Sequence, residues 1–250
     1  MTPQSAGWKY VGFKVCHLAM GRAIEGGETD RETCIVVLSG SARIAVADEV
    51  FAPVGARKSV FEDAAPGAVY VPAGKRYSVT AVTLVAELAF CTAPARPGRA
   101  ARMIGANSMT RETRGRGTNT RYVRNILPDT EPADSLLVVE VITPSGHWSS
   151  YPPHKHDTAT DGAETALEET YYHRVNPSQG FAFQRVYTDD LSLDETLCAK
   201  DGDVVLVPRG YHPVAAPHGY ELYYLNVMAG PTRKWMFRND PAHEWILRAR

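Results

Sequence analysis

Short runs of β-forming residues, separated by glycine and proline, recur along most of the chain. The apolar and polar positions alternate from Arg31 onward, in CIVVLSGSARIAVADEVF, PGAVYVPAGKRYSVTAV and LVAELAFCTAP. The same pattern returns after Tyr122, in SLLVVEVITPSG, GFAFQRVYT, CAKDGDVVLVPRGYHPVAA and YELYYLNVMAG. None of these segments has the apolar stripe of an amphipathic helix. The pattern therefore predicts an all-β protein built from sandwiches or small barrels.

The two halves of the chain resemble each other around one short motif. Residues 67–74, GAVYVPAG, match residues 202–210, GDVVLVPRG: each has a glycine, a run of β-formers and then PxG. The second copy continues into Tyr211 and His212, whereas the first has Tyr77 near the place of that histidine. We interpret this as a structural duplication in which only the second half keeps metal ligands, so one metal site is expected.

The domain organisation follows from composition. Residues 93–117 are rich in proline, glycine and arginine and are the candidate linker. This places an N-terminal domain without metal ligands at 1–105 and a C-terminal domain with the metal site at 106–250. The C-terminal tail, RKWMFRNDPAHEWILRAR, is amphipathic enough to form a closing helix or an arm over a neighbour.

Charge and cysteine content exclude several classes of protein. With 27 basic and 28 acidic residues, the net charge of −1 gives no support for binding to nucleic acid or to an anionic membrane. The cysteines lie far apart and form no CxxC pair, so reduced thiols are expected at Cys16, Cys34, Cys91 and Cys198. No basic leader or apolar run of about 20 residues occurs. We therefore expect a cytoplasmic protein.

The candidate chemistry is concentrated between Tyr151 and Arg174 and in the later segment PRGYHP. Imidazole and carboxylate groups are ligands that divalent transition metals prefer. In an extended chain, His154 and His156 point the same way, and only one of the consecutive glutamates can join them. Alternation favours Glu169, with Glu168 as a close second. His212 comes from a separate strand end, which allows the ligands to surround an ion.

The spacing of these residues resembles the two motifs of the cupin superfamily, G…HxH…E…G and GX5PxGxH. The matching positions are Gly146, His154, His156, Glu169, Gly180, Gly202, Pro208, Gly210 and His212. The stretch from His156 to the glutamate is longer than in the general cupin pattern. Its polar sequence, DTATDGAETA, is expected to loop out beside the site.

The longer stretches WSSYPPHKHD, LEETYYHR, GFAFQRVYT, VPRGYHPV and YYLNVMAGP resemble the 5-deoxy-glucuronate isomerase family of myo-inositol catabolism. The resemblance covers nearly the whole chain and implies a bicupin fold, two cupin β-barrels in tandem. It also implies an aldose–ketose isomerisation of the sugar acid 5-deoxy-D-glucuronate to 5-dehydro-2-deoxy-D-gluconate. By the same resemblance, the ligands of one divalent ion are His154, His156, Glu169 and His212. Zinc is the first expectation, with manganese, iron or nickel as alternatives, and a homo-oligomer is compatible with such an enzyme.

An isomerase of this kind also needs a proton carrier and an anchor for the substrate carboxylate. Tyr171 and His173 share the face of Glu169 and are the candidates for proton transfer. Arg185 can bind the carboxylate if it faces inward. On the other strand parity, Gln184 faces inward and Arg185 does not. Two other readings stay open: an iron-dependent bicupin dioxygenase, and a non-catalytic cupin that binds a sugar acid.

Overall fold

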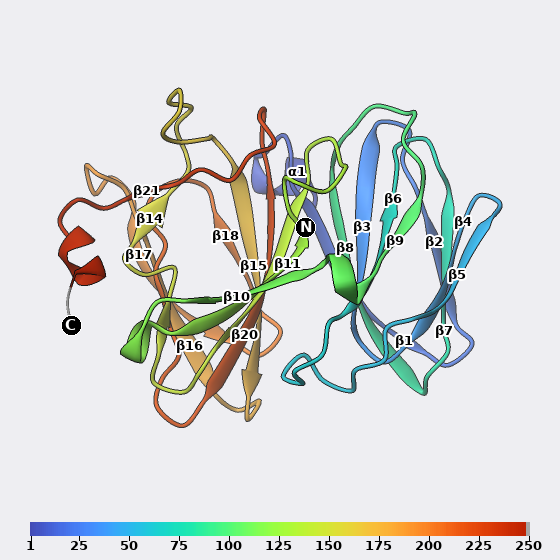
Figure 1. The fold of residues 1–250 in the computed structure, drawn as a ribbon, viewed down its shortest axis with the longest axis horizontal. Helices are drawn as coiled ribbons and strands as arrows, with labels where there is room; N and C mark the ends of the chain where they lie inside the picture. The colour runs from blue at the N-terminus through green and yellow to red at the C-terminus, as the bar shows by residue number, and fades with distance from the viewer. Residues whose placement is uncertain (249–250) are drawn as a thin grey trace. The chain divides into compact units, whose positions relative to one another are not determined.

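The computed structural model describes residues 1–248 and consists almost entirely of β-strands (Figure 1). The prediction of an all-β fold is therefore confirmed. The helical segments are all short: α1 (Pro3–Ala6) and the single 3-10 turns η1 (Ala106–Ser108), η2 (Gly117–Asn119) and η3 (Glu244–Leu247). None of the helices in the described part of the chain is long and apolar enough to cross a membrane.

The chain forms two compact units. The first contains Met1–Thr110 together with Asn125–Val138, and the second contains Arg111–Arg124 together with the chain from Val139 onward. The polypeptide thus passes from the first unit to the second, returns, and passes over again. Residues 93–117, which composition indicated as a linker, hold two strands, β9 (Arg102–Ile104) and β10 (Thr110–Arg114).

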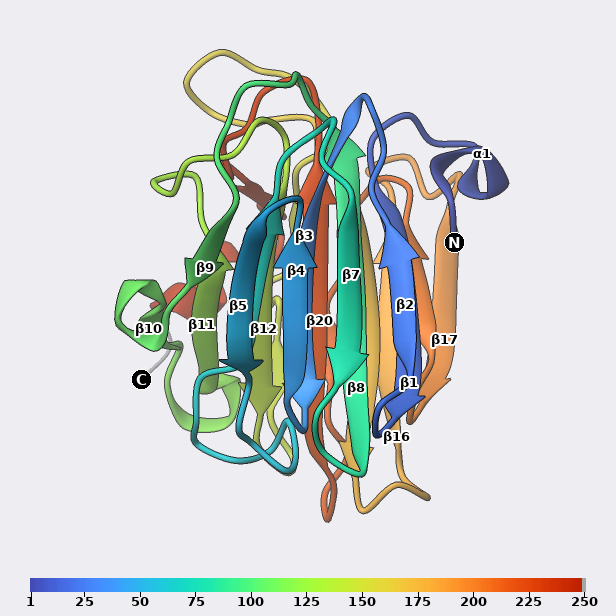
Figure 2. The same ribbon diagram turned by 90° about the vertical axis from the view of Figure 1, so that its right-hand side faces the viewer.

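The first unit is built on two antiparallel sheets. One has the order β1-β8-β3-β6-β9, with β1 at Gly12–Ala19, β8 at Val85–Pro94, β3 at Arg31–Ser39 and β6 at Gly67–Val71. The other, which faces the viewer in Figure 2, has the order β2-β7-β4-β5 (Ala23–Gly26, Tyr77–Ala81, Ala42–Val46 and Glu49–Val54). Alternate apolar residues of both sheets form one buried core, including Ile35, Val37, Ile44, Val46, Val69, Val79 and Leu88. This is the alternation that the sequence predicted.

Three sheets run through the second half of the chain. The largest has the order β10-β11-β12-β20-β15-β18, with β11 at Arg121–Leu127, β12 at Leu137–Thr143, β20 at Glu221–Ala229, β15 at Glu168–Asn176 and β18 at Val204–Val207. A four-stranded sheet has the order β13-β19-β16-β17 (Trp148–Ser149, Val214–Ala215, Phe181–Tyr187 and Asp194–Lys200). The short strands β14 (His154–Lys155) and β21 (Arg238–Asn239) pair with each other (Figure 1). Up to residue 248, the C-terminal tail therefore contributes the short strand β21 and the turn η3, and no long closing helix.

Candidate metal centre

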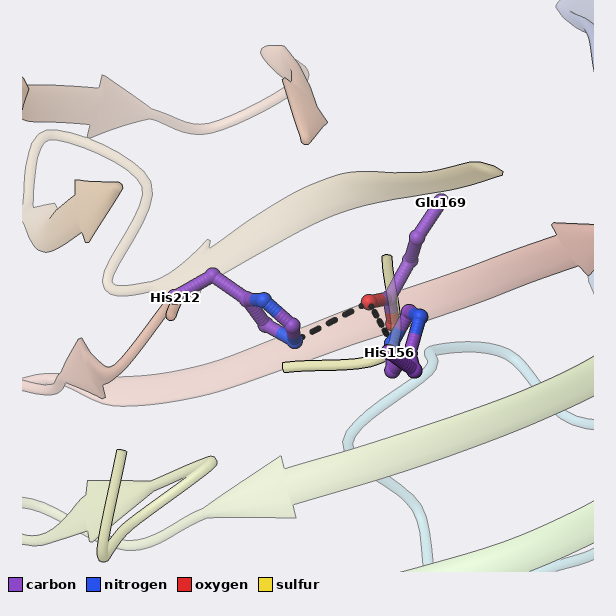
Figure 3. Close-up of side chains that lie close together, drawn as sticks. All are labelled: His156, Glu169 and His212. Carbon is purple, nitrogen blue, oxygen red and sulfur yellow. Dashed lines mark hydrogen bonds and ion pairs between the residues drawn. The ribbon is translucent and has the colours of Figure 1, made fainter. Parts of the chain in front are cut away.

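Three buried side chains converge on one point in the second unit (Figure 3). The Nε2 atom of His156 lies 2.9 Å from Oε2 of Glu169, and Nε2 of His212 lies 3.1 Å from the same oxygen. The candidate ligand atoms of the three residues all lie within 4.8 Å of one another. Each residue is at most 3% exposed, so the cluster is shielded from bulk water.

Strand alternation on β15 positions the carboxylate. β15 lies between β20 and β18, and Glu169, Tyr171 and His173 share one of its faces, on which the rings of Tyr171 and His173 stack. Glu168, on the opposite parity, is partly exposed. Glu169 rather than Glu168 is therefore the glutamate that meets the histidines, because successive side chains of a strand point to opposite faces.

The turn after β18 positions His212. The Nδ1 atom of His212 lies 2.8 Å from the carbonyl oxygen of Gly210, and because a carbonyl oxygen only accepts, the ring proton is on Nδ1. The Nε2 atom then faces Glu169, and in the neutral ring it carries a lone pair. The backbone N–H of Gly210 in turn donates to Oδ2 of Asp157 at 2.7 Å, which joins this turn to the segment that carries His156. A divalent cation fits here, because Nε2 of a neutral His212 ring and the carboxylate of Glu169 are both donor atoms and point into the same space.

Burial and charge act in opposite directions on the ionisation of the cluster. Burial by itself would raise the pKa of Glu169, but the neighbouring His212 and His156 outweigh it and hold that pKa well below its usual range. Burial would lower the pKa of His156, yet the carboxylate of Glu169 raises it overall. Glu169 is thus an anion at neutral pH, as a metal ligand must be.

The fourth predicted ligand, His154, lies beside this group and not within it. It is buried on β14, and its ring centroid is 5.0 Å from that of His212 and 4.5 Å from that of Phe237. Burial, together with the charges of His212 and His156, lowers its pKa well below the usual value. His154 is therefore neutral and has the protonation state of a ligand, although the three-residue cluster forms without it.

The two candidate proton carriers stack on each other next to the cluster. The rings of Tyr171 and His173 are 5.9 Å apart and nearly parallel, and Tyr171 is 5.8 Å from the ring of His212. The hydroxyl of Tyr171 lies 3.0 Å from Oγ of Ser150. His173 Nε2 lies 2.9 Å from Oε1 of Gln184, and burial lowers the pKa of His173 to about 4. His173 is thus uncharged at neutral pH.

Comparison with known proteins assigns the chain to a family. The model of the KduI/IolB family matches residues 1–246. The chain belongs to this family. Proteins called 5-deoxy-glucuronate isomerase are 55% identical in Geobacillus thermodenitrificans (strain NG80-2), over 100% of this chain and 91% of that protein, and 50% identical in Bacillus subtilis (strain 168), over 99% and 91%.

Solved structures agree with the family assignment. A crystal structure of an IolB-like protein from Salmonella typhimurium LT2 matches with a TM-score of 0.97 and 53% identity, over 99% of this chain and 94% of that one. Oxalate decarboxylase from Lactobacillus farciminis matches with a TM-score of 0.66 at 14% identity, over 96% and 82%. At that identity the second likeness concerns the fold alone, and it supports the predicted bicupin architecture, which the strand topology and these matches confirm.

The structure does not bring Arg185 to the cluster of this KduI/IolB chain. Its guanidinium forms two hydrogen bonds with the carboxylate of Asp194, at 2.7 and 2.8 Å, and lies over the ring of Tyr187. The Arg185 side chain is 41% exposed, while Gln184 is fully buried against His173. The strand has the parity in which Gln184 faces inward, so Arg185 lies outside the site.

The structure places three further residues beside the cluster. Asn226 donates from Nδ2 to Oε1 of Glu169, and it is the residue opposite Tyr171 in the pairing of β20 with β15. Ser150 contacts Tyr171 from a left-handed conformation, at φ 50°. Asp157 holds the His212 turn. The pairing of remote strands places Asn226 against Glu169, while Asp157 acts through the turn that carries His212, and no sequence pattern marks Ser150.

Proposed function

We propose that this chain is the metal-dependent aldose–ketose isomerase that converts 5-deoxy-D-glucuronate into 5-dehydro-2-deoxy-D-gluconate in myo-inositol catabolism. The observation that carries the proposal is the 55% identity, over the whole chain, with a relative called 5-deoxy-glucuronate isomerase. The convergence of His156, Glu169 and His212 supports it, because such a reaction needs a centre that stabilises negative charge.

The reaction moves a carbonyl group from C1 to C2 of the sugar acid. A proton leaves C2, negative charge develops on the oxygens of C1 and C2, and a proton is added at C1. A divalent ion held by His154, His156, Glu169 and His212 supplies Lewis-acid stabilisation of this charge. Zinc is our first choice, with manganese, iron or nickel as alternatives, because the donors are imidazole nitrogen and carboxylate oxygen.

For proton transfer we propose Tyr171 and His173. Burial and the nearby Glu169 raise the pKa of Tyr171, so its hydroxyl stays protonated and is available as a donor. Tyr171 is the nearer of the two to the cluster, and His173 stacks on its far side. In this proposal the uncharged His173 takes up the proton that leaves C2, and the hydroxyl of Tyr171 donates the proton that is added at C1.

We propose that the enzyme acts in the cytoplasm and as a homo-oligomer. Cys34 and Cys91 are directly opposite each other on β3 and β8, yet both are free thiols. Free cysteines in such a pairing are compatible with a reducing compartment. The oligomeric state rests on the frequency of symmetric assemblies among metabolic enzymes.

The test is direct conversion of the substrate. Metal-reconstituted protein is incubated anaerobically with 5-deoxy-D-glucuronate, and the sugar is followed by NMR. We expect the ketose to appear without oxygen, which would exclude the dioxygenase and the non-catalytic cupin. His212→Ala is expected to lose nearly all activity, whereas His218→Ala, at an exposed position, keeps it. Absence of ketose with the metal-loaded wild type would contradict the proposal.

A further inference from the structure

A cavity of about 540 Å³ adjoins His154 in the second unit. Its wall includes three arginines, Arg114, Arg116 and Arg121, together with Tyr151 and Phe237. A narrower space of about 20 Å³ shares Arg114, Arg121 and His154 with it. That space is also lined by the residues next to the metal cluster, Tyr171, Tyr224 and Asn226. The two spaces thus share part of their wall on the side of His154.

The three arginines differ in their partners. Arg114 forms an ion pair with Glu112, with 2.9 Å between Nε and the carboxylate oxygen, and lies over the ring of Trp235. Arg116 donates to the carbonyl oxygen of Leu247 at 3.1 Å. Arg121 donates from Nη1 to the carbonyl oxygens of Asn119 and Tyr151, each at 3.1 Å. Among residues 1–248, no carboxylate pairs with Arg121 and none of them accepts from its Nε or Nη2.

The position of Arg121 is costly for an unpaired cation. Burial, and the neighbouring Arg114, lower its pKa, and burying an uncompensated charge is unfavourable. The charge of Arg121 also acts on Tyr171, Tyr224 and His154. An anionic ligand in the cavity would compensate it. The two carbonyl contacts hold one end of the planar guanidinium, which leaves the other donors for a bidentate contact with a carboxylate.

We propose that Arg121 is the carboxylate anchor of the substrate and the residue that selects a sugar acid over a neutral sugar. The C6 carboxylate of the substrate binds the guanidinium, while C1 and C2 extend past His154 towards Glu169. This inference rests on the proposed function for the identity of the sugar. Arg185 is the rival anchor, but its guanidinium already pairs with Asp194.

The test measures binding separately from turnover. The ligands are the substrate reduced at C1 to the alcohol, which cannot isomerise, and the same molecule with a hydroxymethyl group in place of the carboxylate. Calorimetry on the metal-loaded protein should show that Arg121→Gln binds the acid about 10- to 100-fold more weakly, as expected for losing a charge-assisted contact. Its binding of the neutral polyol should not change. Arg121→Lys should fall between wild type and Arg121→Gln.

A matched change of charge serves as the control. Arg43→Gln removes one positive charge from an exposed position on β4 and should bind both ligands as the wild type does. If Arg121→Gln does not fold, Arg121→Lys, which keeps the positive charge, serves as the test. It should weaken binding of the acid and leave binding of the neutral polyol unchanged. In turnover, Arg121→Gln should raise KM for 5-deoxy-D-glucuronate and leave the slow conversion of 5-deoxy-D-glucose unchanged.

Three results would overturn the inference. Arg121→Gln could bind the acid as tightly as the wild type, it could lose the acid and the polyol equally, or Arg185→Gln could abolish the preference for the acid instead. The proposed function fails in a different way. A wild type that binds the acid through Arg121 but forms no ketose would contradict the isomerase and leave the anchor standing.

Discussion

At the scale of single residues, one oxygen atom organises the site. Oε2 of Glu169 is within 3.1 Å of imidazole nitrogens from both His156 and His212. The Nδ1 atom of His212 donates to the carbonyl oxygen of Gly210, so in the neutral ring Nε2 presents a lone pair towards the carboxylate. A divalent cation between them would bind both donor atoms. The residue geometry thus provides the donor atoms that a divalent metal prefers.

His212→Ala is expected to weaken metal affinity more than the roughly 10- to 100-fold that loss of an outer-shell partner costs. The metal content after dialysis against a weak chelator, measured by elemental analysis, checks this. His218→Ala removes a histidine from an exposed position six residues away and should retain the metal. Equal metal content in the two variants would argue against His212 as a ligand.

His173 makes the stability of the folded protein depend on pH, and its contribution can be measured separately from that of other groups. Its pKa falls from 6.5 to about 4 because burial disfavours the charged ring. Below pH 6.5 the unfolded chain therefore binds a proton that the folded chain does not, and stability decreases as the pH falls towards 4. The maximum loss is about 3 kcal/mol. Above pH 6.5 this loss is absent.

The measurement is urea unfolding of the metal-free protein at pH 7.5 and pH 5. The loss of stability on acidification should be smaller in His173→Gln, which has no titrating ring. Other buried groups contribute to both proteins and cancel in the difference. An identical loss in both, or an NMR titration of His173 near pH 6.5, would contradict the expected pKa.

At the scale of elements, β18 and its two flanking glycines position His212. Gly202 and Gly210 both have a left-handed backbone, at φ 87° and φ 88°. They differ in their surroundings: a Cβ on Gly210 would overlap the carbonyl oxygen of Tyr187, whereas a Cβ on Gly202 meets nothing within 4 Å. The turn at Gly210 is also held to β16 by two backbone hydrogen bonds between Tyr187 and Tyr211, at 2.9 and 2.7 Å. Close packing thus fixes the ligand end of the motif.

Substituting each glycine by alanine separates backbone strain from displacement of the ligand. Gly202→Ala should cost about 1 kcal/mol, the lower end of the strain of a non-glycine residue in this conformation. Gly210→Ala should cost more and should also lower metal affinity, because relief of the overlap shifts the turn that carries His212. Denaturant unfolding and metal titration check the two effects. Unchanged metal affinity in Gly210→Ala would show that the turn tolerates the shift.

At the scale of the whole molecule, the returning segment Asn125–Val138 is held to the first unit by one buried carboxylate. Glu32 is fully buried on β3 and accepts from the hydroxyl of Tyr70 at 2.6 Å. It also accepts from three consecutive backbone N–H groups, at 2.7–2.8 Å, those of Asp134, Ser135 and Leu136. Since a buried carboxylate with four donors is well compensated, Glu32 contributes to the stability of the first unit.

Glu32→Gln is expected to lower the free energy of unfolding by about 2 to 3 kcal/mol, because an amide group replaces an anion that accepts from four donors. Urea denaturation measures this loss. Glu25→Gln, at an exposed position on β2, should change stability little. Metal affinity should be unaffected, because the metal cluster belongs to the second unit. A loss of metal in Glu32→Gln would show that the two units are coupled.

The fold was largely predictable because alternation along a strand is a local property. The motifs around Gly67 and Gly202 form β6 and β18 as expected, each followed by a turn. Residues 93–117 also contain short strands that composition does not indicate, for a physical reason. β9 is only three residues long and exists because it pairs with β6, which is remote in sequence. Composition alone cannot reveal a strand that is formed by its partner.

The sequence by itself determined the donor types and the order of the site: two histidines two apart, one glutamate of a consecutive pair, and a histidine after PxG. Alternation separates Glu169 from Glu168 in any extended chain. Only the tertiary structure decided which face of β16 is buried, and so placed Gln184 inside and Arg185 outside. It also brought Arg121, distant in sequence from the histidines, to the cavity beside His154. Parity shows which residues share a face, but the pairing and packing of remote strands decide which face surrounds the site.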